Sequence, residues 1–242
     1  LSSEEVGKQL RGVVSYLDGY GTNEVVGSDG ALVMSAPVIR GNSLYTIVDG
    51  PSWTEAEANS VNLGGHLATI NNLAENQFLV KSFKYTDPAP GSSGYQRNST
   101  YPLHWIGLTD KENEGLWEWS STEPLMFTNW IDGNTPDNHT WYSANGADYA
   151  SINYYQATPT DDANNGSWWN WSEGERSVGV TDDKTQGIAE IPFIRRGDSA
   201  YVIVEGPTWE EAEANAVALG GHLVTINDAE ENEWLVDQYY GE

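Results

Sequence analysis

The chain has 242 residues, with 11 Lys and Arg against 36 Asp and Glu, a formal net charge of −25 and no cysteine. Such a charge repels phosphate backbones and anionic membranes and attracts cations, so we expect no nucleic-acid partner and no membrane insertion. Without cysteine there is no disulfide and no thiolate metal site, whereas 38% hydrophobic residues and 11 Trp indicate a folded acidic protein.

Residues 1–37 form a region of their own. Leu1 to Tyr20 predicts a helix, because apolar residues recur at helical spacing behind an S/T-x-x-E capping box that begins at Ser2. Glycines at positions 19 and 21 then end the pattern. We interpret residues 1–37 as a linker, or as the tail of an upstream module, that contains one helix.

The next feature is an internal repeat. The 44 residues that begin at Gly41 return from Gly197, 156 positions later, with 26 identities. Both copies carry a capping box, SWTE from Ser52 and TWEE from Thr208, and a Gly-Gly pair that stops the helix. Each copy therefore predicts the order β-α-α. In the first copy the expected elements are a strand at 45–48, a helix at 53–63, an extended piece at 66–70 and a helix from 71.

Short apolar segments follow in the first copy and are separated by polar loops. They read HWIGL, LWEWS, PLMFTNW, DYASINYY, SWWNW and GIAEIPF, and each is typical of a strand. The pattern predicts an α+β domain with a small antiparallel sheet at residues 38–193. Residues 194–242 hold only the start of a second domain of this kind, and we expect this fragment to be unstable alone.

The order of these motifs resembles a known family. The chain resembles the C-type lectin-like domain, in particular its cysteine-free bacterial members. The motifs that carry the resemblance are, in order, a β-α-α start, Trp105-Ile106-Gly107-Leu108, FTNW, a proline loop, a Trp-Asn segment and a closing GIAEIPF. The resemblance covers Val38 to Phe193 and the beginning of the second copy. It implies two helices, small antiparallel sheets and a long loop region that carries calcium, to which sugar-binding members of the family add two sugar hydroxyls.

The resemblance places a sugar loop at Thr135-Pro136-Asp137. The family motif there is Glu-Pro-Asn or Gln-Pro-Asp, so Asp137 matches the galactose-type variant while Thr135 offers only a short hydroxyl. The family's Trp-Asn-Asp element corresponds either to residues 169–171 or to residues 168–170, and both alignments keep Asn170 and lose a carboxylate. The implied ligand-binding residues, including two tryptophans that lie near the loop in the sequence, are Thr135, Asp137, Asn170, Trp141 and Trp168.

A second calcium position of the family keeps more of its oxygens. The resemblance assigns it to Asp110, Glu114, Asn138 and Asp148, with Asp137 as a further ligand. Calcium prefers six to eight oxygen ligands, and carboxylates suit it. The competing hypothesis is that Asp110 and Glu114 are solvated loop residues of a very acidic protein.

The sequence offers no catalytic motif. It has no G-x-S-x-G elbow, P-loop or H-E-x-x-H, and so we expect a binding protein rather than an enzyme. Our main hypothesis is a secreted, extracellular or cell-surface adhesion module of a tandem-repeat protein, stabilised by calcium. Its partners would be a glycan or surface protein, and neighbouring repeats or other copies of the chain. The alternative is a calcium-dependent carbohydrate-binding lectin that acts through Thr135-Pro136-Asp137.

Overall fold

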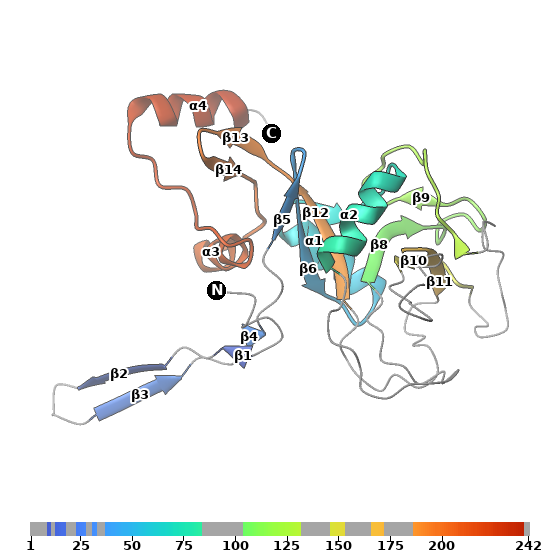
Figure 1. Cartoon of the computed structure of the whole chain (residues 1–242). Helices are drawn as coiled ribbons and strands as arrows, with labels where there is room; N and C mark the ends of the chain where they lie inside the picture. The colour runs from blue at the N-terminus through green and yellow to red at the C-terminus, as the bar shows by residue number, and fades with distance from the viewer. Residues whose placement is uncertain are drawn as a thin grey trace.

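A computed structural model describes residues 9–10, 13–17, 23–27, 31–32, 37–83, 104–131, 146–152, 166–171 and 186–239 (Figure 1), of which those before 37 are described only by their backbone. Its centre is a sheet with the strand order β11-β10-β8-β12-β6-β5, to which β7 and β9 are added on β12 and β8. The strands are β5 (Val38–Arg40), β6 (Ser43–Asp49), β7 (His66–Leu67), β8 (His104–Thr109), β9 (Glu118–Trp119), β10 (Tyr149–Ile152), β11 (Trp168–Trp171) and β12 (Gln186–Pro192).

The last of these strands, β12, lies in the middle of the sheet. It pairs antiparallel with β6 from Gln186↔Asp49 to Pro192↔Ser43 and parallel with β8 through Gly187↔Trp105. The end of the unit is therefore inserted between its beginning and its middle. The strands from β5 to β12 make one sheet, and together with the helices they confirm the α+β class.

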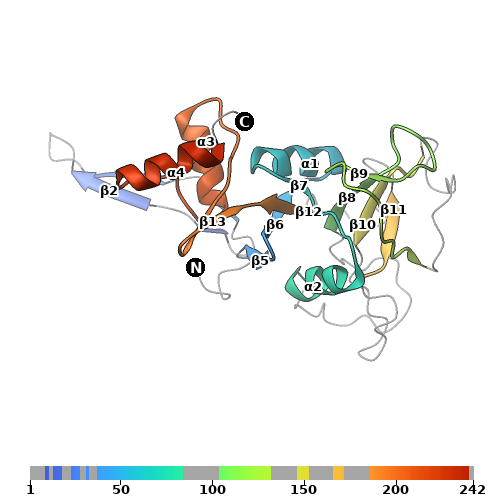
Figure 2. The same ribbon diagram turned by 90° about the horizontal axis from the view of Figure 1, so that it is seen from above.

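Two helices cover opposite faces of the sheet (Figure 2), α1 (Trp53–Asn62) and α2 (Leu73–Phe83). Each helix belongs to a separate buried cluster: Trp53 and Ala56 of α1 and the C-cap residue Leu63 pack with β12 residues, while Leu79 and Val80 of α2 join a second cluster. The tryptophan of the WIGL segment, Trp105, and its neighbours Ile106 and Leu108 are buried, so this motif is part of the core as its composition predicts.

The helix starts confirm the capping boxes. Ser52 accepts a hydrogen bond from the backbone N–H of Glu55 at 3.2 Å, and its hydroxyl donates to the Glu55 carboxylate at 2.8 Å. Thr208 and Glu211 repeat both contacts at 3.2 and 2.7 Å. The glycine after each helix, Gly64 or Gly220, has a positive φ, which glycine adopts without steric cost.

The second copy folds as two short strands and two helices. These are β13 (Ile194–Arg196), β14 (Ser199–Tyr201), α3 (Trp209–Ala218) and α4 (Ala229–Tyr239). The copy touches the first unit at the end of α1, where Glu205 N–H donates to the Asn62 carbonyl at 3.0 Å. Val202 and Leu219 also pack against the α1 cluster.

Two predictions of secondary structure are wrong. The expected N-terminal helix is replaced by strand pairs, since β1 (Gln9–Leu10) pairs with β4 (Ala31–Leu32) and β2 (Val13–Leu17) pairs with β3 (Asn23–Gly27). The PLMFTNW segment forms no extended strand and contributes only an isolated bridge between Trp130 and Trp168. In the described parts of the chain, every helix is too short or too polar to span a bilayer.

Candidate functional site

Three strand ends meet at one edge of the sheet and define the candidate site. Tyr149 at the start of β10 is paired with Thr109 at the end of β8 and with Trp171 at the end of β11. Asp110 follows β8, and its backbone N–H donates to the Asp148 carbonyl at 3.1 Å. The fold therefore brings Asp110, Asp148 and the β11 residue Asn170 to the same end of neighbouring strands.

Asp110 is the most constrained residue of this site. Only 4% of it is exposed, and its Oδ2 accepts the Gly115 N–H at 2.9 Å, which closes a turn whose glycine has a φ of 77°. Oδ1 is buried and has no hydrogen-bond partner among the described residues. Burial raises the pKa of the Asp110 carboxyl; the Gly115 hydrogen bond opposes this rise, while the negative charges of Glu114 and Asp148 add to it.

The other expected calcium ligands divide into two groups. Glu114 is exposed and Asp148 is half-buried, and both lie close enough to act on the Asp110 carboxyl. Asn138 and Asp137 lie in residues 132–145, outside the described residues. Within the described residues, no three carboxylate or imidazole groups form a ready-made metal site. A complete calcium site would therefore need oxygens from outside the described residues.

The chemistry at Asp110 nevertheless fits a hard cation. A buried carboxylate oxygen without a donor is costly, and a cation removes that cost by ligating it. Two further acidic side chains increase the negative potential at this point. Asn170 lies at the same edge, where its Nδ2 donates to the Ala147 carbonyl at 3.2 Å, next to Asp148.

The expected ligand-binding role of Trp168 is wrong. Trp168 is fully buried, and its Nε1 donates to Asn76 Oδ1 at 2.8 Å. Its ring packs edge-to-face on Trp119, Trp130 and Phe127. It is a core residue with no face available to a ligand.

The exposed aromatic residue of β11 is its neighbour Trp169, which sequence reasoning missed. Trp169 is 37% exposed and stacks on Trp171, with the ring centroids 6.0 Å apart and an angle of 11° between the planes. Trp171 is held in turn by a 2.8 Å hydrogen bond from its Nε1 to Ser151 Oγ. Alternation along a strand predicts that Trp168 and Trp169 point to opposite faces, but with three tryptophans in four residues it does not say which one is inside.

Thr135 and Trp141, the remaining sugar-loop residues, also lie outside the described residues.

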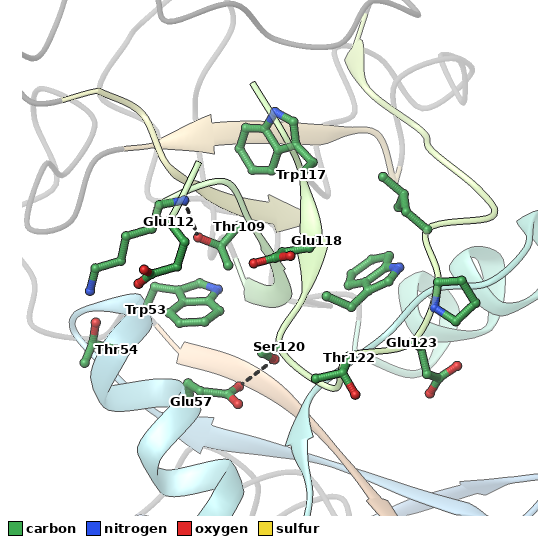
Figure 3. A pocket seen from close by; sticks show the side chains of 14 residues that line it. Trp53, Thr54, Glu57, Thr109, Glu112, Trp117, Glu118, Ser120, Thr122 and Glu123 are labelled. Carbon is green, nitrogen blue, oxygen red and sulfur yellow. Dashed lines mark hydrogen bonds between the residues drawn. The ribbon is translucent and has the colours of Figure 1, made fainter. Parts of the chain in front are cut away.

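A hollow of about 550 Å³ lies beside this site, with Lys111 and Glu112 of the Asp110–Gly115 turn on one wall (Figure 3). Glu57 points into it but is already engaged, since its carboxylate accepts from Ser120 Oγ at 3.1 Å and from the Leu67 N–H at 2.8 Å. Its other oxygen lies 2.6 Å from His66 Nδ1. Glu57 thus joins α1 to β7 and the β9 turn, and its role is structural.

Comparison with known proteins extends this description. The Lectin C-type domain profile matches residues 49–185. C-type lectin domain family 4 member F of Mus musculus is 33% identical over 110 residues, which are 44% of this chain and 17% of that protein. Galactose-specific lectin nattectin of Thalassophryne nattereri is 33% identical over 101 residues, 41% of this chain and 56% of its own length. Human lymphocyte antigen 75 is 25% identical over 205 residues, 79% of this chain and 10% of its own length.

Among solved structures, the human scavenger receptor C-type lectin carbohydrate-recognition domain aligns with a TM-score of 0.47 and 22% identity, over 64% of this chain and 95% of that chain. The chain spans 10% to 56% of the length of the three relatives described. Members of the matched family are non-catalytic carbohydrate-binding proteins, which supports the expectation of a binding role for the matched region. Because the matched region makes up more than half of the sequence, the chain belongs to the C-type lectin domain family.

Proposed function

We propose that residues 38–193 form a non-catalytic, calcium-stabilised binding domain of an extracellular tandem-repeat protein, and that its ligands are glycans. The family supports the ligand class, and one relative is named as a galactose-specific lectin. The repeated half-domain supports an arrayed protein, in which weak sites gain strength by acting together.

The observation that carries the calcium proposal is the buried, unpartnered Oδ1 of Asp110. Its carboxyl lies near the charges of Glu114 and Asp148, in a chain whose net charge is −25. Carboxylates in such proximity repel one another unless a cation or a proton intervenes. Calcium would be held by these three side chains with oxygens from Asn138 and Asp137, and when bound it would supply a fixed positive charge that neutralises the cluster.

The observation that favours a glycan over a purely structural role is the Trp169–Trp171 stack on the edge strand β11. A partly exposed ring that is fixed by a second ring offers a flat apolar surface at little cost in side-chain entropy. The apolar face of a sugar ring suits such a surface. Thr135-Pro136-Asp137 would add direct contacts to sugar hydroxyls, with a shorter first ligand than the family motif provides.

A glycan-array screen in calcium and in EGTA tests the proposal. We expect binding in calcium that is lost in EGTA and in Asp110→Asn, and weakened by Trp169→Ala. Trp209→Ala is the matched control, since Trp209 is a more exposed tryptophan on the second copy, at 67% exposure. Glycan binding that is unchanged by EGTA would remove calcium from the function. Binding of no glycan, together with calcium-dependent thermal stability, would leave a calcium-stabilised scaffold.

A further inference from the structure

The second copy exposes the residues that the first copy buries. Residue pairs related by the 156-residue repeat can be compared directly: five apolar side chains of the second copy are 48–67% exposed, while their counterparts in the first copy are at most 8% exposed. The pairs, first copy first, are Ile47 and Ile203, Trp53 and Trp209, Ala68 and Val224, Ile70 and Ile226, and Val80 and Val236. One face of the second copy therefore has the composition of a core without its cover.

The polar contacts that lie within the second copy are nonetheless formed. Tyr201 Oη donates to Glu231 at 3.0 Å and the Asn227 N–H donates to the same carboxylate at 2.9 Å. The first copy has the same contacts at 3.0 and 2.8 Å, between Tyr45, Asn71 and Glu75. Likewise Glu213 contacts His222 at 2.7 Å, as Glu57 contacts His66 at 2.6 Å. These contacts hold β14, α3 and α4 in the arrangement of the first copy.

In the first copy the corresponding face is covered by strands that supply hydrogen-bond acceptors. The Trp53 indole donates to the Ile106 carbonyl of β8 at 2.8 Å. Glu190 of β12 accepts from Tyr45 Oη at 2.8 Å and from the Thr69 N–H at 3.1 Å. The corresponding donors in the second copy are Trp209, Tyr201 and Thr225. Within the described residues, no acceptor is found for the Trp209 indole or the Thr225 N–H.

We propose that residues 194–239 are the first half of a second C-type lectin domain, and that their exposed apolar face binds a segment like residues 104–193 of the first copy. Its β12-type strand would pair antiparallel with Ser199–Glu205 and place a carboxylate on Tyr201 and Thr225. Its β8-type strand would offer a carbonyl to Trp209. A purely apolar partner would leave the Thr225 N–H without an acceptor, so the carboxylate distinguishes this occupant from a non-specific apolar one.

The first measurement uses the chain as it is. Hydrogen exchange should show amides of α3 and α4 exchanging at least 1,000-fold faster than the repeat-related amides of α1 and α2, although the two copies share most of their sequence. Equal protection in the two copies would overturn the proposal. Dimerisation in analytical ultracentrifugation, with exchange in α3 and α4 that slows as the concentration of the chain rises, would assign the face to a second copy of the chain and would also overturn it.

The second measurement supplies the occupant. Residues 87–193 are appended after Glu242, the register that the 156-residue repeat dictates. We expect exchange in α3 and α4 to slow at least 100-fold. The matched control carries Ile→Asp at the appended counterparts of Ile106 and Ile188, which are fully buried in the first copy, and should leave exchange fast. The proposal fails if the intended and control extensions give the same exchange rates.

Discussion

Trp53 and Trp209 occupy the same repeat position in opposite environments, and so one substitution made at both sites isolates the effect of packing. Trp53 is 8% exposed, stacks on Tyr149 at 5.0 Å and donates to the Ile106 carbonyl. Replacing a buried tryptophan with alanine costs about 3–5 kcal/mol, through lost burial and the cavity that remains. Trp209 is 67% exposed, and substitutions at such positions change stability by about 0.5 kcal/mol or less.

The expected difference in unfolding free energy is therefore about 3 kcal/mol or more. For a unit of about 150 residues, Trp53→Ala should lower Tm by roughly 6–20 °C while Trp209→Ala leaves it nearly unchanged. For each variant, urea denaturation gives the unfolding free energy and thermal denaturation gives Tm. Both are followed by far-UV circular dichroism, because fluorescence would itself change with the tryptophan content. If Trp53→Ala does not fold, Trp53→Phe and Trp209→Phe give the same comparison at a cost of about 1–2 kcal/mol for Trp53 alone. Equal losses at the two positions would refute the assignment of Trp209 to an uncovered face.

Two further predictions compare repeat-related positions in the same way, and a third concerns pH. Gly64→Ala should destabilise the chain more than Gly220→Ala: both glycines have a positive φ, but only a Cβ at Gly64 would clash with a neighbouring atom, the Ile203 carbonyl oxygen. Hydrogen exchange of residues 202–206 should become faster in Gly64→Ala alone. Asn76→Ala should cost about 2–4 kcal/mol, since its buried amide joins Trp168 to the Gly166 carbonyl, whereas the exposed Asn232 should tolerate alanine in the same urea titration. Acidification should destabilise the fold through His104, whose pKa burial lowers from 6.5 to about 4. The unfolded chain takes up this proton as pH falls through 6.5, and the folded chain does so only near 4. The unfolding free energy should therefore fall by about 1.4 kcal/mol between pH 7.5 and 5.5, and it should fall by that much less in His104→Gln over the same range.

The repeat made half of the fold predictable from the sequence. Both copies have an N-cap residue, Ser52 or Thr208, and a glycine after the helix, Gly64 or Gly220. These residues predicted both helix ends, because caps and left-handed glycines act locally. The strands β8, β9, β10, β11 and β12 could also be located, since each is a short apolar run bounded by polar turns. Their order in the sheet, with β12 between β6 and β8, depends on contacts distant in sequence, and the sequence did not predict it.

The errors have physical causes. The apolar spacing around Val13 and Leu17 fits a helix, but Gly7 and Gly12 each weaken a helix by about 1 kcal/mol, and the VVSYL segment is rich in residues that favour strands. PLMFTNW contains a proline and exposes Met126, so its apolar composition reflects a loop anchored by Trp130.

The candidate site was predictable only in part. The resemblance named Asp110 and Asp148, which the structure brings together at adjoining strand ends, whereas the choice between Trp168 and Trp169 required the packing around Asn76.

Isothermal titration of calcium into the chelator-treated chain at neutral pH tests the central claim most directly. We expect saturable binding at the Asp110 site that disappears in Asp110→Asn and persists in Asp49→Asn, which removes the same charge from an exposed position on β6. Absence of binding heat in the unmodified chain, or equal binding in Asp110→Asn, would contradict it.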